Sequence, residues 1–185
     1  MPDLFESYIG PTVKSEGGYS DNPNDSGGPT MYGITEVRAR AAGYVGDMRN
    51  LARDQAITIY RLFYWQQPQF DRLTGISTEL AMLCLDFGVN MGQSWPGRFV
   101  QRALNVLNGR GQDWPDLTTD GNLGAMSRAA LQSYKDRRGT TGIEVLLAMV
   151  RAQASVRYIE IAENASKNED FEYGWQRQRA FSLDK

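Results

Sequence analysis

The stretch from Lys14 to Thr35 constrains the fold more than any other part of the sequence, because it cannot continue a helix. The residues up to its glycine pair, 3–16, carry apolar side chains at helical spacing, so the helix is expected to end inside this stretch. A glycine pair at 17–18 is typical of a helix end. The run that follows is dense in Gly, Asn, Asp, Ser and Pro, which favours turns. We expect short strands around Tyr19 and over 31–34, forming a hairpin or a small three-stranded sheet.

The rest of the chain is predicted to be helical. Apolar residues recur there with the period of an amphipathic or buried helix. The segment 78–91 is apolar almost throughout and is therefore expected to be the central buried helix. The fold class is mainly α (α+β), with the small sheet near residues 19–35. The other helices are expected over 35–42, with Thr35 as the N-cap, and over 51–66, 96–108, 124–134 and 142–162, with a short terminal helix around 171–181.

The absence of histidine narrows the chemistry that the chain can perform. It excludes zinc sites built on histidine and every nucleophile that relies on a histidine base. General acid–base work must then come from Asp, Glu, Lys or Tyr. The single cysteine, Cys84, lies in an apolar run and allows no disulfide framework. We expect no cofactor and no metal, since the Asp- and Asn-rich loop lacks the closing glutamate of a calcium loop.

Charge and hydropathy exclude further classes of protein. The formal net charge is −2, so no basic stripe predicts a nucleic-acid partner. No apolar run reaches the roughly 18 residues of a membrane span. The first residues show neither a basic region nor a long apolar region, so we expect no signal peptide and synthesis in the cytoplasm.

Glu16 is the candidate acid. It is expected at the C-terminal end of the first helix, where the helix dipole disfavours negative charge and raises the carboxyl pKa. Glycosidic cleavage needs such an acid and usually a second carboxylate. Asp21 and Asp25 follow within a few residues, and Thr30 can position a water. By spacing alone, the same residues also fit a solvated loop.

Asp86 and Asn90 interrupt the apolar helix 78–91 four residues apart, so they share one face. Buried polar side chains need partners. The pair is either a structural hydrogen-bond pair or part of a substrate cleft. Tyr19, Tyr32 and Trp65 can stack on sugar rings or belong to the core.

The string EGGYSDNPNDSGGPTMYGIT, residues 16–35, resembles the signature EGGYxNxPxDxGGxTxxGIT of glycoside hydrolase family 108, which contains bacterial and phage muramidases. The string departs locally at Ser20-Asp21, where Val-Asn is common. IYRLFYW at 59–65 and LDFGVNMG at 85–92 are similar to further elements of that family. DGNLGAMSRAAL at 120–131 resembles peptidoglycan-binding modules. GWQR at 174–177 resembles the family's GW-x-x-R ending, with Arg177 one place early and Arg179 one place late.

The resemblance implies a lysozyme-like catalytic portion over 1–92 and a helical, peptidoglycan-binding-like portion over 93–185 packed on it as one globular unit. It assigns the catalytic glutamate to Glu16. By looser analogy with phage lysozymes, Asp25 is the second carboxylate and Thr30 positions the water. It also raises the expectation that Asp86 and Asn90 bind substrate. With the two tyrosines that can stack on sugar rings, the expected substrate-binding residues are Tyr19, Tyr32, Asp86 and Asn90.

The function implied is that of a peptidoglycan-degrading endolysin. We expect an N-acetylmuramidase that hydrolyses the β-1,4 bond between N-acetylmuramic acid and N-acetylglucosamine, in cytolysis by a bacteriophage. The enzyme would wait as a monomer in the host cytoplasm and reach periplasmic peptidoglycan through a holin-type pore. A lytic transglycosylase and a non-catalytic peptidoglycan-binding or secretion-assisting protein stay open as alternatives. Retention and inversion are both open, because sequence does not give the carboxyl separation.

Overall fold

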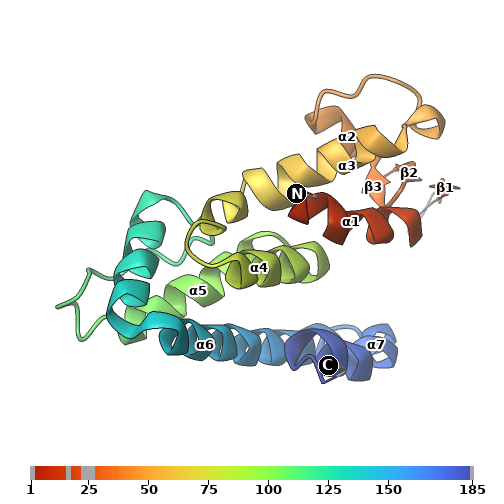
Figure 1. Cartoon of the computed structure of the whole chain (residues 1–185). Coiled ribbons are helices and arrows are strands. Elements are labelled where there is room, and N and C mark those ends of the chain that lie inside the picture. The colour runs from red at the N-terminus through yellow and green to blue at the C-terminus, as the bar shows by residue number, and fades with distance from the viewer. Residues whose placement is uncertain (1–2, 16–17, 22–27, 184–185) are drawn as a thin grey trace. The chain divides into compact units, whose positions relative to one another are not determined.

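The computed structural model describes residues 3–15, 18–21 and 28–183. The chain divides into two compact units, Met1–Gln67 and Pro68–Lys185. Helices dominate both units, and the first also holds a three-stranded antiparallel sheet of strand order β1-β2-β3 (Figure 1). The predicted mainly α fold class with a minor sheet is confirmed.

The first unit combines α-helices with the small sheet. Its elements in chain order are α1 (Leu4–Ser15), β1 (Tyr19–Ser20), β2 (Thr30–Met31), β3 (Ile34–Thr35), α2 (Glu36–Ala41), the 3-10 helix η1 (Met48–Asn50), α3 (Arg53–Arg61) and the π-helical turn η2 (Leu62–Gln66).

The core of the first unit lies between α1 and α3, which pack against each other. Phe5, Ile9 and Val13 recur every four residues along α1 and are fully buried, as the helical period requires. The Phe5 ring lies 6.0 Å from that of Trp65. Trp65 is buried and therefore serves as core in this unit. Pro11 lies inside α1 and removes one helical hydrogen bond without ending the helix.

The second unit is a set of packed helices. α4 carries eight buried residues and packs on α5, which lies along α6 (Figure 1). Its elements are the 3-10 helix η3 (Phe70–Leu73), α4 (Thr78–Met91), α5 (Ser94–Leu107), α6 (Ala125–Glu163), the 3-10 helix η4 (Ser166–Asn168), α7 (Glu169–Gly174) and the π-helical turn η5 (Trp175–Ala180).

The helices expected at 124–134 and 142–162 are joined in α6. Gly139 interrupts it with a φ of 64° and a ψ of −154°, which are not helical values. Such a backbone favours glycine. The sequence therefore marked two helical segments, and the structure shows that a single-residue break separates them rather than a loop.

The loop between α5 and α6 is fixed by the side chain of Gln101, which is 1% exposed. The Gln101 amide donates to Asp120 Oδ1 at 2.8 Å and to the Asn122 carbonyl at 3.0 Å. Its Oε1 accepts the Gly121 N–H at 2.8 Å. A Cβ on Gly97 would lie 2.0 Å from the Gly121 carbonyl oxygen, so only glycine allows α5 and this loop to approach so closely.

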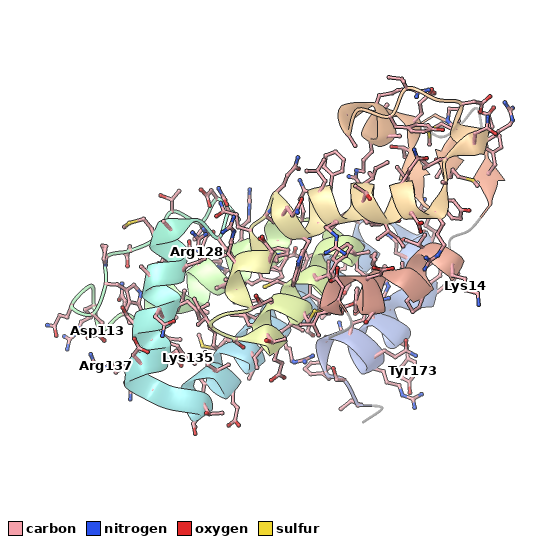
Figure 2. All side chains as sticks on the ribbon, turned by 45° about the horizontal axis from the view of Figure 1, so that its top comes forward. Lys14, Asp113, Arg128, Lys135, Arg137 and Tyr173 are labelled. Carbon is pink, nitrogen blue, oxygen red and sulfur yellow. The ribbon has the colours of Figure 1, made fainter. Side chains whose placement is uncertain are left out.

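An ion pair ties the same loop region to α6. Arg137 of α6 donates to the carboxylate of Asp113, and the two lie together where the part of α6 that precedes Gly139 ends (Figure 2). Nearby, Lys135 donates to the Ile76 carbonyl and Arg128 donates to the Leu123 carbonyl at 2.9 Å. These contacts hold the connecting segments of the second unit onto α6.

Candidate active site

The sheet of the first unit carries the described part of the EGGY signature. β1 pairs with β2 through Tyr19↔Met31, and β2 pairs with β3 through Met31↔Ile34. Tyr32 and Gly33 form the two-residue turn between β2 and β3, with φ values of 54° and 73°. Two positive φ values are the pattern of a type I′ turn, which matches the twist of a hairpin. The signature therefore shapes a tight hairpin.

The tip of this hairpin is anchored on α3. The Tyr60 hydroxyl donates to the Tyr32 carbonyl at 3.1 Å. Tyr60 also stacks on Tyr64, with ring centroids 5.5 Å apart. Tyr32 is thus placed by its backbone, and its positive φ is held by a contact from α3. Two motifs that are separate in the sequence, MYGIT and IYRLFYW, meet here.

A second anchor comes from α2. Thr35 caps that helix by accepting the Arg38 N–H at 3.4 Å, as predicted. The Arg38 guanidinium donates to the Tyr64 hydroxyl and lies over the rings of Phe63 and Tyr64, 5.5 and 5.0 Å from their centroids. Sequence reasoning missed Arg38. Its only signal is its place three residues after a capping threonine, which gives no hint of its aromatic partners.

Tyr19 contacts two charged side chains, Asp21 and Arg49. Its hydroxyl donates to Asp21 Oδ2 at 3.1 Å, and the Arg49 guanidinium lies 4.5 Å from its ring centroid. Loss of hydration and the hydrogen bond to Asp21 raise the pKa of the Tyr19 phenol. The local departure at Asp21 thus supplies the carboxylate that orients Tyr19. Arg49 is the second residue that sequence reasoning missed.

Tyr19 and Asp21 also line a pocket of about 400 Å³. Pro29, from the same signature, lies in its wall. The rest of the lining comes from α2, η1 and the segment between them. Part of the signature therefore faces a concave surface large enough for part of a ligand.

Thr30 lies in β2, directly after the glycine- and proline-rich loop. Its hydroxyl donates to the Gly28 carbonyl at 3.2 Å. The Pro29 carbonyl accepts the Glu36 N–H at 2.8 Å, so both ends of this short segment are fixed. Because the Thr30 hydroxyl donates to the backbone, its oxygen lone pairs stay available to accept a hydrogen bond from a water.

Glu16 and Asp25 lie outside the described residues. In the sequence, Glu16 directly follows the last residue of α1, and Asp25 falls between β1 and β2. Their catalytic roles stay predictions from the signature.

Asp86 and Asn90 belong to α4 in the second unit. Arg179 donates to the Asp86 carboxylate, and Asn90 donates to the Asp86 carbonyl at 2.6 Å and to Asp86 Oδ1 at 3.2 Å. The two residues share a face of α4, as predicted, and are hydrogen-bonded to each other. Their part in substrate binding stays a prediction.

A buried tryptophan between α5 and α6 has structural partners. Trp114 is buried, donates its indole N–H to the Leu104 carbonyl at 3.2 Å, and meets Tyr134 edge-on. Within residues 3–15, 18–21 and 28–183, no three His, Cys, Asp or Glu side chains gather in a way that could hold a metal ion. In the same ranges, no helix is long and apolar enough to cross a membrane.

Comparison with known proteins agrees with this geometry. Residues 9–92 match the model of the glycosyl hydrolase 108 family, and residues 95–180 match that of a predicted peptidoglycan domain. No curated protein matches the chain. Among solved structures, Brucella abortus SagA is similar in fold, with a TM-score of 0.62 and 22% sequence identity over 97% of this chain and 94% of that one.

The two family models meet between α4 and α5, whereas the compact units divide after Gln67. The expected division into functional portions at 92 stays a prediction, because neither boundary reports which residues act on substrate. The activity follows from the family: the chain is a glycoside hydrolase that degrades peptidoglycan. Residues 9–92 are thus a match to the glycosyl hydrolase 108 family, and residues 95–180, which follow them, are a match to a predicted peptidoglycan domain.

Proposed function

We propose that this enzyme is an N-acetylmuramidase that hydrolyses the β-1,4 bond between N-acetylmuramic acid and N-acetylglucosamine. The observation that carries the proposal is the signature from Glu16 to Thr35, which lies inside the glycosyl hydrolase 108 segment. Its described part forms a hairpin whose tip is held on α3 by Tyr60. A rigid hairpin supports catalysis because groups that act on one bond must be held in fixed positions.

The proposed mechanism uses two carboxylates and one hydroxyl. Glu16 is the general acid that protonates the leaving oxygen of the glycosidic bond. Asp25 stabilises the oxocarbenium-like transition state or directs the attacking water. Thr30 accepts a hydrogen bond from that water, which its donation to the Gly28 carbonyl permits. The chain has no histidine, so carboxylates are the natural acid and base.

Substrate binding is proposed for the two tyrosines of the hairpin and for the polar pair on α4. Tyr19 lines the pocket of about 400 Å³ and is oriented by Asp21 and Arg49. Tyr32 presents its side chain from the tight turn. Asp86 and Asn90 would contribute hydrogen bonds to the sugar.

The proposed biological role is cytolysis by a phage or prophage endolysin. The enzyme would stay in the host cytoplasm until the inner membrane is opened and would then act on periplasmic peptidoglycan as a monomer. Degradation of peptidoglycan, which the family supports, is the activity that such a role requires.

Mass spectrometry of muropeptides released from purified sacculi tests the chemistry. The wild type should release fragments with a reducing N-acetylmuramic acid end. Glu16→Gln should lower the rate roughly 100- to 10,000-fold, because it removes the proton donor. Glu6→Gln is the matched control, since Glu6 is an exposed carboxylate on α1, and it should keep wild-type activity. A 1,6-anhydromuramic end would instead identify a lytic transglycosylase, and unchanged clearing by Glu16→Gln would remove the catalytic role of that residue.

Expression in a Gram-negative host tests the lytic role. Cells producing the enzyme should stay intact and lyse only after the inner membrane is permeabilised, and Glu16→Gln cells should survive the same treatment. Lysis without permeabilisation would contradict the proposed cytoplasmic retention. Survival after permeabilisation, with active enzyme in the extract, would contradict the lytic role.

A further inference from the structure

A groove between α5 and α6 stands apart from the hairpin chemistry. It has a volume of about 260 Å³ and is lined from α5 by Trp95, Phe99 and Arg102. The facing wall comes from residues 152–160 of α6. All of these residues fall inside the predicted peptidoglycan domain, 95–180, for which the family description names no binding site.

The charge of the groove is positive and partly uncompensated. Arg157 donates to Glu160 Oε2 at 2.9 Å, so these two charges offset each other. Arg102 is exposed and has no ion pair or hydrogen-bond partner within the part of the chain that the structure describes. The groove therefore presents one free guanidinium beside a neutralised pair, and a guanidinium is suited to bidentate recognition of a carboxylate.

The aromatic floor is arranged for apolar contact rather than for stacking on sugar. The Arg157 guanidinium lies over the Trp95 ring at 4.1 Å from the centroid, and Arg98 lies 5.7 Å from it. A sugar ring needs an uncovered aromatic face, and Arg157 occupies one. Val156, 56% exposed, adds an apolar wall that suits a methyl group or a methylene chain.

The wall also has unused hydrogen-bonding capacity. Gln153 Oε1 and Arg157 Nε are buried and have no hydrogen-bond partner among the described residues. The Gln153 amide nitrogen is fixed, because it donates to the Phe99 carbonyl at 3.0 Å and to the Met149 carbonyl at 3.2 Å. Buried polar atoms without partners mark places where a water or a ligand is expected.

We propose that this groove binds the carboxylate-bearing stem peptide of peptidoglycan, with Arg102 as the carboxylate-binding residue. The glycan strand is made of uncharged pyranose rings once the lactyl group is amide-linked, whereas each stem peptide carries free carboxylates and short apolar side chains. A free guanidinium next to Val156 and Phe99 matches the peptide. The inference deepens the proposed action on peptidoglycan by naming which part of the polymer the second unit holds.

Titration of the full-length protein with isolated stem peptide tests the proposal, with binding followed by NMR at the Trp95 indole N–H and by calorimetry. The peptide contains no glycosidic bond, so the result does not depend on the bond that the enzyme cleaves. Free peptide should shift the Trp95 signal in a saturable manner. Peptide with amidated carboxylates should bind at least 10-fold more weakly, as expected from the loss of a charge-assisted hydrogen bond.

Variants locate the site. Arg102→Gln should weaken binding of the peptide about 10-fold, and Arg102→Glu should weaken it further. Arg110→Gln is the matched control, because Arg110 is exposed and lies outside the groove lining. Equal binding by Arg102→Gln and wild type would overturn the proposal, as would tighter binding of a peptide-free disaccharide than of the peptide. Failure of wild type to cleave sacculi would instead refute the proposed muramidase and leave the binding result standing.

Discussion

Replacing Gln101 with leucine should destabilise the second unit by about 2–6 kcal/mol. Leucine fills a similar volume but offers no hydrogen bond. The buried Gly121 N–H loses its acceptor, Gln101 Oε1 at 2.8 Å. The Ser127 hydroxyl loses its donor, the Gln101 amide at 3.3 Å. Each buried polar group left unpaired costs roughly 1–3 kcal/mol. Asp120 and Asn122 are exposed, so water can replace the amide there and adds little to the cost.

The measurement is urea unfolding followed by tryptophan fluorescence and circular dichroism, with the free energy taken by linear extrapolation. Gln132→Leu is the control, since Gln132 is an exposed residue of α6 with one hydrogen bond to Asp136. It should change stability by less than about 0.5 kcal/mol. A loss below about 1 kcal/mol for Gln101→Leu, at an unchanged m-value, would refute the view that this side chain fixes the loop.

The same substitution should alter the pH dependence of stability. Hydrogen bonds from Gln101 and then from the Asn122 N–H hold the pKa of the Asp120 carboxyl below its usual value. The folded-state pKa is therefore lower than the unfolded one, near 4. The stability that the ionised Asp120 carboxylate contributes is therefore present above the unfolded-state pKa. It is lost as the pH falls through the folded-state pKa. Gln101→Leu should accordingly lose less stability than wild type between neutral pH and the acid range.

Three further outcomes are expected. Gly97→Ala should cost about 2–3 kcal/mol or more, because the added Cβ meets a backbone carbonyl at 2.0 Å, whereas Gly75→Ala, with no atom within 4 Å of its Cβ, should be nearly neutral in the same unfolding assay. Burial raises the pKa of the Cys84 thiol, so it should not react with a disulfide reagent at mildly alkaline pH until guanidinium chloride unfolds the protein; rapid native reaction would contradict this. Arg179→Ala should cost about 1–3 kcal/mol by leaving the Asp86 carboxylate, 18% exposed, without that donor, and a double-mutant cycle with Asp86→Asn should show coupling of the two residues.

Local signals in the sequence predicted elements well where the local pattern decides the structure. The apolar run 78–91 became α4 with the same ends, because a buried helix is specified by its own composition. Thr35 caps α2 as expected, since capping depends on residues three apart. The small sheet in the glycine- and proline-rich stretch was also predicted correctly, because turn-forming residues act on their immediate neighbours.

Contacts between distant segments could not be predicted. Arg38 and Arg49 carry no local signature, and their aromatic partners are defined only once the first unit has folded. The partner of Asp86 lies at Arg179, far along the chain. Gly139 falls between the two helices expected at 124–134 and 142–162, and a break of one residue cannot be told from a short loop in the sequence. The two proposed catalytic carboxylates rest on the signature alone.

The position of α4 limits how this chain can be recombined with its relatives. α4 lies in the glycosyl hydrolase match yet packs on α5 and α6, which belong to the peptidoglycan match. In a chimera joined between α4 and α5, where the two family matches meet, α4 of one parent would have to pack against α5 and α6 of the other. A junction after Gln67 keeps α4 with the helices it covers, so exchange of wall specificity between such enzymes should succeed there and fail between α4 and α5.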